Sequence, residues 1–139
     1  VVAASDAKFG IPEVKRGLVA GAGGLLRLPR QIPSRIAMEL ALTGDFISAE
    51  RAYELGMINR VVEPGNALDG ARALATAIAA NGPLALIASK QIMRESQDWS
   101  QAEMFDKQNT IANPVFSSED AIEGATAFAE KRPPQWKGR

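Results

Sequence analysis

The sequence predicts an α/β fold in which a mixed first part passes into an α-helical second part. In the first part, short apolar and β-branched runs at residues 1–4 and 57–62 alternate with helical signals. After Pro64-Gly65, apolar residues recur at helical spacing instead. No repeat, low-complexity tract or linker rich in Gly, Ser or Pro interrupts the chain. We therefore treat residues 1–65 and 66–139 as two parts of one fold.

The first part opens with an extended segment and two short helices. Residues 1–9 are expected to form a strand and a turn, because Pro12 has no amide hydrogen and disfavours a helical residue before it. A short helix is expected over residues 23–30. Ser34 is then expected to cap a second helix, which Gly44 ends.

A third short helix and a buried strand complete the first part. Ser48 is expected to cap the helix, with Glu50 in its first turn, and Gly56 to end it. Residues 57–62 are apolar and β-branched, which is typical of a short buried strand, and Pro64-Gly65 ends this strand.

The second part consists of successive amphipathic helices. The first of these carries apolar residues at helical spacing, namely Leu68, Ala71, Leu74 and Ile78. Asn81-Gly82-Pro83 ends it, and Pro83 begins another helix that runs to about Ser96. Ser100 is expected to cap the third helix.

Ser117 or Ser118 is expected to cap the last helix, which Pro133-Pro134 stops. Three apolar residues of this helix are expected to face inward: Ile122, Ala125 and Phe128. Such helices need a surface to cover. A self-contained small bundle is the alternative.

Composition excludes several classes of function. The chain has 139 residues, 46% of them hydrophobic, which suits one modest domain. Sixteen basic and sixteen acidic residues cancel, so nothing in the charge favours nucleic acid or a membrane surface as a partner. No apolar run approaches the ~18 residues of a transmembrane helix. We expect neither a nucleic acid nor a membrane partner.

The chain contains no Cys and no His. It therefore offers no thiol nucleophile, no thiolate or histidine metal site and no Ser-His-Asp triad, and we expect no metal. Catalysis by residues of this chain would therefore use carboxylates, Lys, Ser, Tyr53 or backbone amides. A cytoplasmic location fits a chain without cysteine.

One stretch, Lys8 to Pro29, carries the main functional signal. Glu13 follows the turn at Pro12, where a carboxylate can point into a cleft. Glycines then precede the apolar run of the next helix, where they permit close approach and leave amide hydrogens free to donate. The alternative is a solvated glutamate beside tightly packed glycines. The dinucleotide pattern is not met, because Leu26 occupies its third glycine position.

As a whole, the sequence resembles the crotonase (enoyl-CoA hydratase/isomerase) family. The pattern FGxPE, Gly, GxGG and RLP is matched by Phe9, Gly10, Pro12, Glu13, Gly17, Gly21, Gly23, Gly24, Arg27, Leu28 and Pro29. Further matches are Leu42-Thr43-Gly44-Asp45, Ile47-Ser48-Ala49, Ala52, Gly56, Asn59, Val61-Val62, Glu123-Gly124, Ala127-Phe128 and Glu130-Lys131-Arg132. The resemblance covers nearly the whole chain in order.

The resemblance implies the C-terminal half of a crotonase (ββα-spiral) fold. Residues 1–65 would be the last part of the α/β core, and residues 66–139 a helical region that packs onto neighbouring subunits in trimers or hexamers. The chain begins without Met, at what is expected to be a strand already under way. A comparable length of crotonase-type chain is therefore expected before Val1.

The implied activity is that of an enoyl-CoA hydratase of fatty acid metabolism, a lyase that adds water to a 2-enoyl-CoA. Glu13 matches the second of two family glutamates, the one assigned to protonate C2. The first glutamate and the oxyanion amides would lie before Val1. Gly21 stands where the dienoyl-CoA isomerase branch carries an Asp, which favours a hydratase, although Ala20 replaces a common Pro. Residues of the acyl end of the pocket would be Gly21, Ala22, Gly23 and Gly24.

At the other end, Phe128 and Lys131 match family positions that meet the adenosine and 3′-phosphate of CoA. The alternative is a cation that complements the end of a helix, with Phe128 in the core. Ala112, where hydratases often have an aromatic residue, weakens the expectation of adenine stacking. Arg132, Lys137 and Arg139 are expected to be solvated charges of the tail.

The resemblance implies no cofactor, because the CoA thioester is itself the substrate. Two alternatives remain open. One is another acyl-CoA enzyme of the same fold, such as a double-bond isomerase or an acyl-CoA hydrolase. The other is a non-catalytic acyl-CoA-binding paralogue. The residue at the upstream acid position would separate these alternatives.

Overall fold

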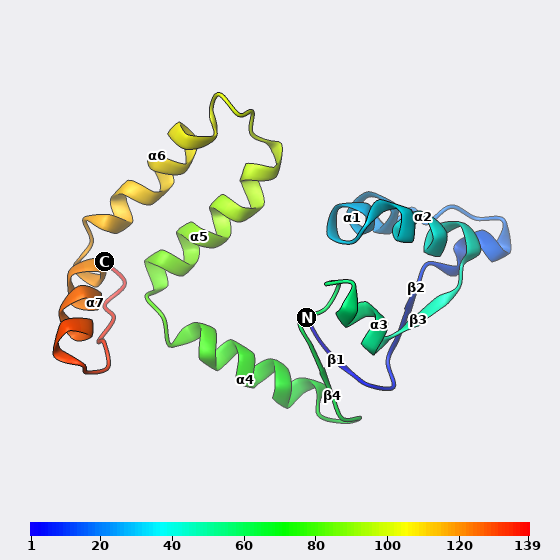
Figure 1. Cartoon of the computed structure of the whole chain (residues 1–139), viewed down its shortest axis with the longest axis horizontal. Coiled ribbons are helices and arrows are strands. Elements are labelled where there is room, and N and C mark those ends of the chain that lie inside the picture. Colours follow the sequence, from blue (N-terminus) through cyan, green and yellow to red (C-terminus); the bar gives the residue numbers. More distant parts are fainter. The chain divides into compact units, whose positions relative to one another are not determined.

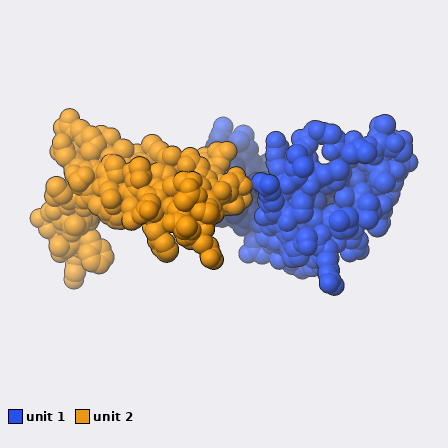
Figure 2. All heavy atoms as spheres, turned by 90° about the horizontal axis from the view of Figure 1, so that it is seen from above, with its two compact units in different colours: residues 1–74 blue, residues 75–139 orange.

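A computed structural model describes all residues, 1–139. The chain divides into two compact units, residues 1–74 and 75–139, coloured separately in Figure 2. This division falls within helix α4 (Ala67–Ala79). We describe each unit by itself. The division of function after residue 65, into a core and an oligomerisation region, stays a prediction.

Unit 1 contains two pairs of short strands. Strand β1 (Val2–Ala4) pairs in parallel with β4 (Arg60–Val62), with Ala3 opposite Val61. Strand β2 (Lys8–Gly10) pairs in antiparallel with β3 (Phe46–Ser48). These strands, combined with helices, confirm the predicted α/β class. Strand β3 was not predicted, and β4 is shorter than expected.

Four short helices accompany these strands in unit 1 (Figure 1): η1 (Pro12–Arg16), α1 (Gly24–Gln31), α2 (Ser34–Thr43) and α3 (Ala49–Glu54). Gly44 ends α2 with a left-handed backbone, and the Ser48 hydroxyl accepts a hydrogen bond from the Arg51 amide. Both caps were predicted. The prediction for Ser34 is wrong, because Pro33 is the N-cap of α2 and its carbonyl accepts the first amides.

Apolar side chains form the core of unit 1 in two clusters. Ala49 and Ala52 of α3 are fully buried, with Ala3 and Ile58 beside them. The second cluster lies between α1 and α2 and consists of Leu28, Ile32, Ala37 and Leu40. Ile47 and Met57 pack against both clusters. The core therefore ties the β2–β3 pair, which leads into η1, to the helices.

Unit 2 is helical. After the end of α4 it contains α5 (Pro83–Glu95), η2 (Ser96–Asp98), α6 (Met104–Phe116) and α7 (Glu119–Glu130). Helix α6 packs against both α5 and α7. Pro83 is the first residue of α5, as predicted, and Ser118, one of the two predicted candidates, caps α7. Ser100 does not cap α6, because its hydroxyl donates to the Glu103 carboxylate instead of accepting from an amide.

The face of α7 that is covered differs from the predicted one. Ile122, Ala125 and Phe128, expected to face inward, are all exposed. Asp120 and Ala127 are buried instead. The segment after α7 folds back along this polar face, where its amides bond to Asp120. Backbone hydrogen bonding therefore decides which face of α7 is covered.

No single helix has the length and apolar composition to cross a membrane, although α4 together with residues 83–98 meets those criteria as a bent pair. No three Asp or Glu residues are grouped so that they could hold a metal ion.

Candidate active site

Glu13 lies in the first turn of η1, which a proline and a glycine delimit. Pro12 is the first helical residue, and Ile11 before it is the N-cap. Gly17 closes the turn with φ 67°, and its amide donates to the Val14 carbonyl over 3.1 Å. The Leu18 amide donates to the Glu13 carbonyl over 3.1 Å. The backbone that carries the carboxylate is therefore held at both ends.

The carboxylate of Glu13 has a buried oxygen atom, Oε2, with no hydrogen-bond partner. Buried polar atoms without partners are rare in folded proteins, because desolvation is then uncompensated. No cation of the chain forms an ion pair with this carboxylate. Its proton-accepting and proton-donating capacity is thus free for another molecule.

A second contact anchors η1 to the end of α2. The Lys15 ammonium forms an ion pair with the Asp45 carboxylate. Gly44 lies close to the same side chain, because a Cβ atom there would come within 3.0 Å of Lys15 and 3.1 Å of Val14. Glycine at position 44 therefore permits η1 to lie directly on the turn after α2.

The glycine segment leads from η1 into α1. Gly21 and Ala22 are exposed in a turn. Gly23 is the N-cap of α1 with φ 91°, and the Arg27 guanidinium lies 3.3 Å from where its Cβ would be. A Cβ at Gly24 would meet the Ile11 side chain at 3.5 Å. Gly24 therefore lies against the residue that precedes η1.

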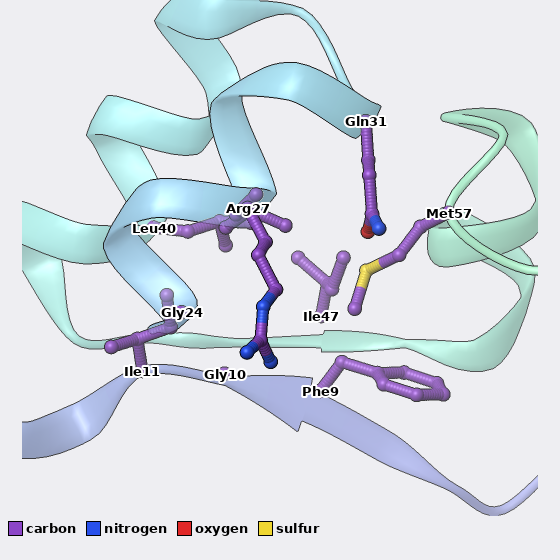
Figure 3. A pocket seen from close by; sticks show the side chains of 10 residues that line it. Phe9, Gly10, Ile11, Gly24, Arg27, Gln31, Leu40, Ile47 and Met57 are labelled. Atoms are coloured by element: carbon purple, nitrogen blue, oxygen red, sulfur yellow. The ribbon is translucent and has the colours of Figure 1, made fainter. Parts of the chain in front are cut away.

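A cavity of about 200 Å³ lies between α1 and the β2–β3 pair. Figure 3 shows ten lining residues: Phe9, Gly10, Ile11, Gly24, Arg27, Leu28, Gln31, Leu40, Ile47 and Met57. The walls are mainly apolar, and Arg27 and Gln31 extend from α1 toward the strands. Of the residues predicted for this region, Gly24 alone lines the cavity.

Sequence reasoning missed Arg27 and Gln31 as lining residues. They stand four positions apart on one face of α1, a spacing visible in the sequence. Nothing local, however, indicates that this face looks onto the β2–β3 pair, because β3 comes more than a dozen residues later.

The two residues predicted for nucleotide binding lie in unit 2. Phe128 is 88% exposed and is therefore not part of a core formed within this chain. Lys131 is the C-cap of α7 and has a left-handed backbone with φ 55°. Its ammonium forms no ion pair, and it stays a candidate for binding an anion.

Arg132 is not the solvated charge that the sequence suggested. Its guanidinium donates to both carboxylate oxygens of Glu123, over 2.6 and 3.0 Å. This bidentate bond, together with the amide of Gln135, lowers the pKa of Glu123 from 4.5 to about 2. Glu123 in turn raises the pKa of Arg132. Lys137 and Arg139 are paired with Glu119 but remain largely exposed.

Comparison with known proteins identifies the family. The model of the enoyl-CoA hydratase/isomerase family matches residues 1–139. Carnitinyl-CoA dehydratases of Salmonella arizonae and Escherichia coli are 42% and 43% identical over 99% and 100% of this chain. The chain covers 54% and 55% of their lengths and so spans about half of these relatives.

Solved structures agree with this assignment. The enoyl-CoA hydratase of Mycobacterium tuberculosis H37Rv superposes with a TM-score of 0.96 at 64% identity, and that of Mycobacterium marinum with 0.96 at 65%. Each match covers 99% of this chain and 55% of the solved one, as expected for a sequence that resembles half of such a protein. The chain belongs to the enoyl-CoA hydratase/isomerase family and has the α/β fold of the crotonases.

Proposed function

We propose that the protein containing this chain is an enoyl-CoA hydratase, which adds water across the double bond of a 2-enoyl-CoA. The observation that carries the proposal is the buried, unpartnered Oε2 atom of Glu13. Membership of a family of CoA-thioester enzymes supports the choice of substrate class. The identity with solved enoyl-CoA hydratases supports the choice of reaction.

In this proposal Glu13 holds the reacting water and donates a proton to C2 as the new C–O bond forms at C3. Hydration of a 2-enoyl thioester also needs a second acid–base group, which takes the proton that the water loses, and donors to the thioester oxygen where negative charge develops. By the family pattern those groups belong to residues outside this sequence. No cofactor is required, because the CoA thioester is the substrate.

The remaining predicted residues bind the substrate in this proposal. Gly21, Ala22, Gly23 and Gly24 shape the acyl end of the site, where the lack of large side chains leaves room. Lys131 contacts the 3′-phosphate of CoA, supported by its unpaired ammonium. The exposed ring of Phe128 lies three residues before it. We also propose a homotrimer or a hexamer, and a cytoplasmic location.

A second candidate is the dehydration of a 3-hydroxyacyl-CoA, the reverse of the same chemistry. The relatives named carnitinyl-CoA dehydratase favour it, at 42–43% identity. A double-bond isomerase, an acyl-CoA hydrolase and a non-catalytic binding protein also remain alternatives. Assays of the complete protein with a short 2-enoyl-CoA and with carnitinyl-CoA distinguish these candidate activities by the product that forms.

The test of the proposal is the variant Glu13→Gln in the complete protein. Glutamine keeps the shape of the side chain but cannot transfer a proton. We expect the rate of hydration of a short 2-enoyl-CoA to fall by roughly 10²–10⁴, with little change in melting temperature.

Glu63→Gln is the matched control, because it removes a carboxylate from an exposed position. It should leave hydration unchanged. Hydration by Glu13→Gln at the wild-type rate would reject the role of Glu13. A wild-type protein that binds enoyl-CoA without converting it would instead favour the non-catalytic alternative.

A further inference from the structure

Lys131 has a backbone conformation that lysine rarely adopts. It is the only residue other than glycine with a positive φ, 55°. Helices commonly end in this conformation, but glycine is the usual residue there because a Cβ atom is disfavoured. The Lys131 amide donates to the Phe128 carbonyl, and the Arg132 amide to that of Ala127. A neighbouring structure must hold this turn against its intrinsic preference.

The segment Arg132–Arg139, here called the C-terminal strap, is fastened to α7 directly after Lys131. Arg132 makes its bidentate bond to Glu123 and also donates to Glu130 over 2.6 Å. The Gln135 amide donates to the same Glu123 carboxylate over 2.7 Å. Glu123 therefore holds the strap at two points, one on each side of Pro133-Pro134.

The far end of the strap is fastened independently. Asp120, only 5% exposed, accepts hydrogen bonds from the amides of Lys137 and Gly138, over 2.7 and 3.0 Å. Trp136 donates from its indole nitrogen to the Ala80 carbonyl over 2.8 Å. Its ring lies against Gly124, where a Cβ would come within 3.3 Å. The strap therefore returns along α7 in one defined path.

This path determines which cations of the C-terminal segment are neutralised. Arg132 pairs with Glu123 and Glu130, while Lys137 and Arg139 pair with Glu119. Of the four cations after Glu130, Lys131 alone has no carboxylate partner. Glu123 and Glu130 are both occupied by Arg132.

We propose that the Glu123–Arg132 pair is a positioning device that fixes the left-handed turn at Lys131 and keeps its ammonium free for the 3′-phosphate of CoA. This inference rests on the proposed role of Lys131 in binding the CoA nucleotide. Glu123 and Arg132 do not contact the ligand themselves. They act by determining the direction of the Lys131 side chain and by withholding its competing partners.

The test compares KM for an enoyl-CoA with KM for its 3′-dephospho analogue in the complete protein. The ratio of KM for the 3′-dephospho analogue to KM for enoyl-CoA reports recognition of the 3′-phosphate alone, and it falls toward one as that recognition is lost. In Glu123→Gln we expect this ratio to fall by about threefold or more with kcat unchanged, because the turn at Lys131 loosens. Glu119→Gln is the matched control. It removes the ion pairs of Lys137 and Arg139 but leaves Glu123 in place, so the ratio should keep its wild-type value.

Arg132→Lys is a second variant, which keeps the charge but loses the bidentate geometry. It should also lower the KM ratio, and it keeps the inference testable if Glu123→Gln does not fold. Fluorescence of Trp136, in a background in which Trp99 and any other tryptophan of the complete protein are replaced by Phe, reports whether the strap has moved. A loosened strap with a wild-type ratio would overturn the inference alone. Equal KM ratios in the wild type and in Lys131→Ala would overturn the proposed role of Lys131, and the inference with it.

Discussion

The buried oxygen of Glu13 is costly for the folded chain by itself. Leaving a buried acceptor without a hydrogen bond costs about 1–3 kcal/mol, a large part of the stability of a small domain. The structure nevertheless holds Glu13 in place through Pro12, Gly17 and the ion pair between Lys15 and Asp45. A carboxylate that is firmly positioned but unsatisfied is the arrangement expected of a group that meets its partner in a ligand.

Gly44 provides a test of this positioning that does not alter Glu13. The variant Gly44→Ala places a Cβ at φ 66° and against the side chains of Lys15 and Val14. We expect a loss of roughly 1–2 kcal/mol from the left-handed backbone and about 1 kcal/mol more from the displaced contacts. Chemical denaturation of the complete protein measures the total loss in the free energy of unfolding. The value of kcat reports whether η1, and Glu13 with it, is displaced.

The matched control is Gly56→Ala. Gly56 has φ 75° but nothing within 4 Å of its Cβ position, so it should show the backbone cost only and an unchanged kcat. If both variants lost the same stability and the same kcat, contact between η1 and Gly44 would have no part in positioning Glu13.

Lys131 should recognise the CoA nucleotide and not the acyl group. In Lys131→Ala we expect KM for enoyl-CoA to rise by roughly tenfold with kcat nearly unchanged, which is the signature of lost uniform binding. The effect should shrink for the 3′-dephospho substrate, in which the charge partner is missing. Lys137→Ala, which removes a cation already paired with Glu119, should change neither value. Equal losses on both substrates would leave Lys131 with a structural role only.

At the scale of elements, local chemistry predicted where helices begin and end better than it predicted which elements they contact. The caps at Ser48 and Ser118, the left-handed end at Gly44 and the start at Pro83 each depend on one residue's own bonding. Strand β3 was missed because three residues are too few to show alternation, and only pairing with β2 creates it.

The covered face of α7 could not be predicted from its apolar spacing. Periodicity shows that Ile122 and Phe128 share a face, but not that this face stays uncovered within the chain. Likewise, the cavity beneath α1 brings Arg27 together with Phe9 and Met57, residues 18 and 30 positions away. Such long-range contacts decide where a site lies. Glu13 was identified by resemblance to a family, and the geometry then added its unpartnered oxygen.

The pairing of α7 with the strap predicts a pH dependence. The carboxyl of Glu123 has its pKa lowered from 4.5 to about 2, chiefly by hydrogen bonds from Arg132 and then by the Gln135 amide. A lowered acid pKa means that the carboxylate's contribution to stability is complete above pH 4.5 and disappears as pH falls through about 2. The strap should therefore remain closed at pH 4 and open near pH 2.

Trp136 fluorescence measures this opening in a background in which Trp99 and any other tryptophan of the complete protein are replaced by Phe. The indole leaves Gly124 and the Ala80 carbonyl when the strap detaches, so its emission should shift to longer wavelength. In Glu123→Gln the strap should be looser at every pH and lack this transition. Opening of the wild-type strap with a midpoint near 4.5 would contradict the lowered pKa.

At the scale of the whole molecule, the distribution of buried residues differs sharply between the units. Both apolar clusters lie in unit 1. The buried residues of unit 2 are Ala88, Ser118, Asp120 and Ala127, and no large side chain of the chain is fully buried. Large apolar side chains of unit 2 remain exposed instead, among them Phe105, Phe116, Ile122 and Phe128. Small buried residues provide little of the free energy that stabilises a domain.

A polypeptide limited to Val1–Arg139 should for these reasons neither fold as a stable monomer nor hydrate enoyl-CoA. Strand β1 is better protected than the sequence suggested, because it pairs with β4, yet each two-stranded pair keeps free edges. Exposed apolar surface and free edges favour association. Catalysis should fail because the polypeptide lacks the upstream acid and oxyanion donors of the family pattern, and removal of even one such donor typically costs ~10²–10³ in rate.

Light scattering, calorimetry and a hydration assay on this polypeptide test the expectation together. We expect aggregates or oligomers, a broad transition without a cooperative peak, and no turnover. Adding the upstream half of the family fold as a separate polypeptide should restore order first, because its surface covers exposed apolar side chains. Turnover should follow only when that half carries its acid. A monomer of confirmed mass that melts cooperatively and hydrates enoyl-CoA unaided would show that residues 1–139 contain a complete site, and Glu13 would then need a partner from within them.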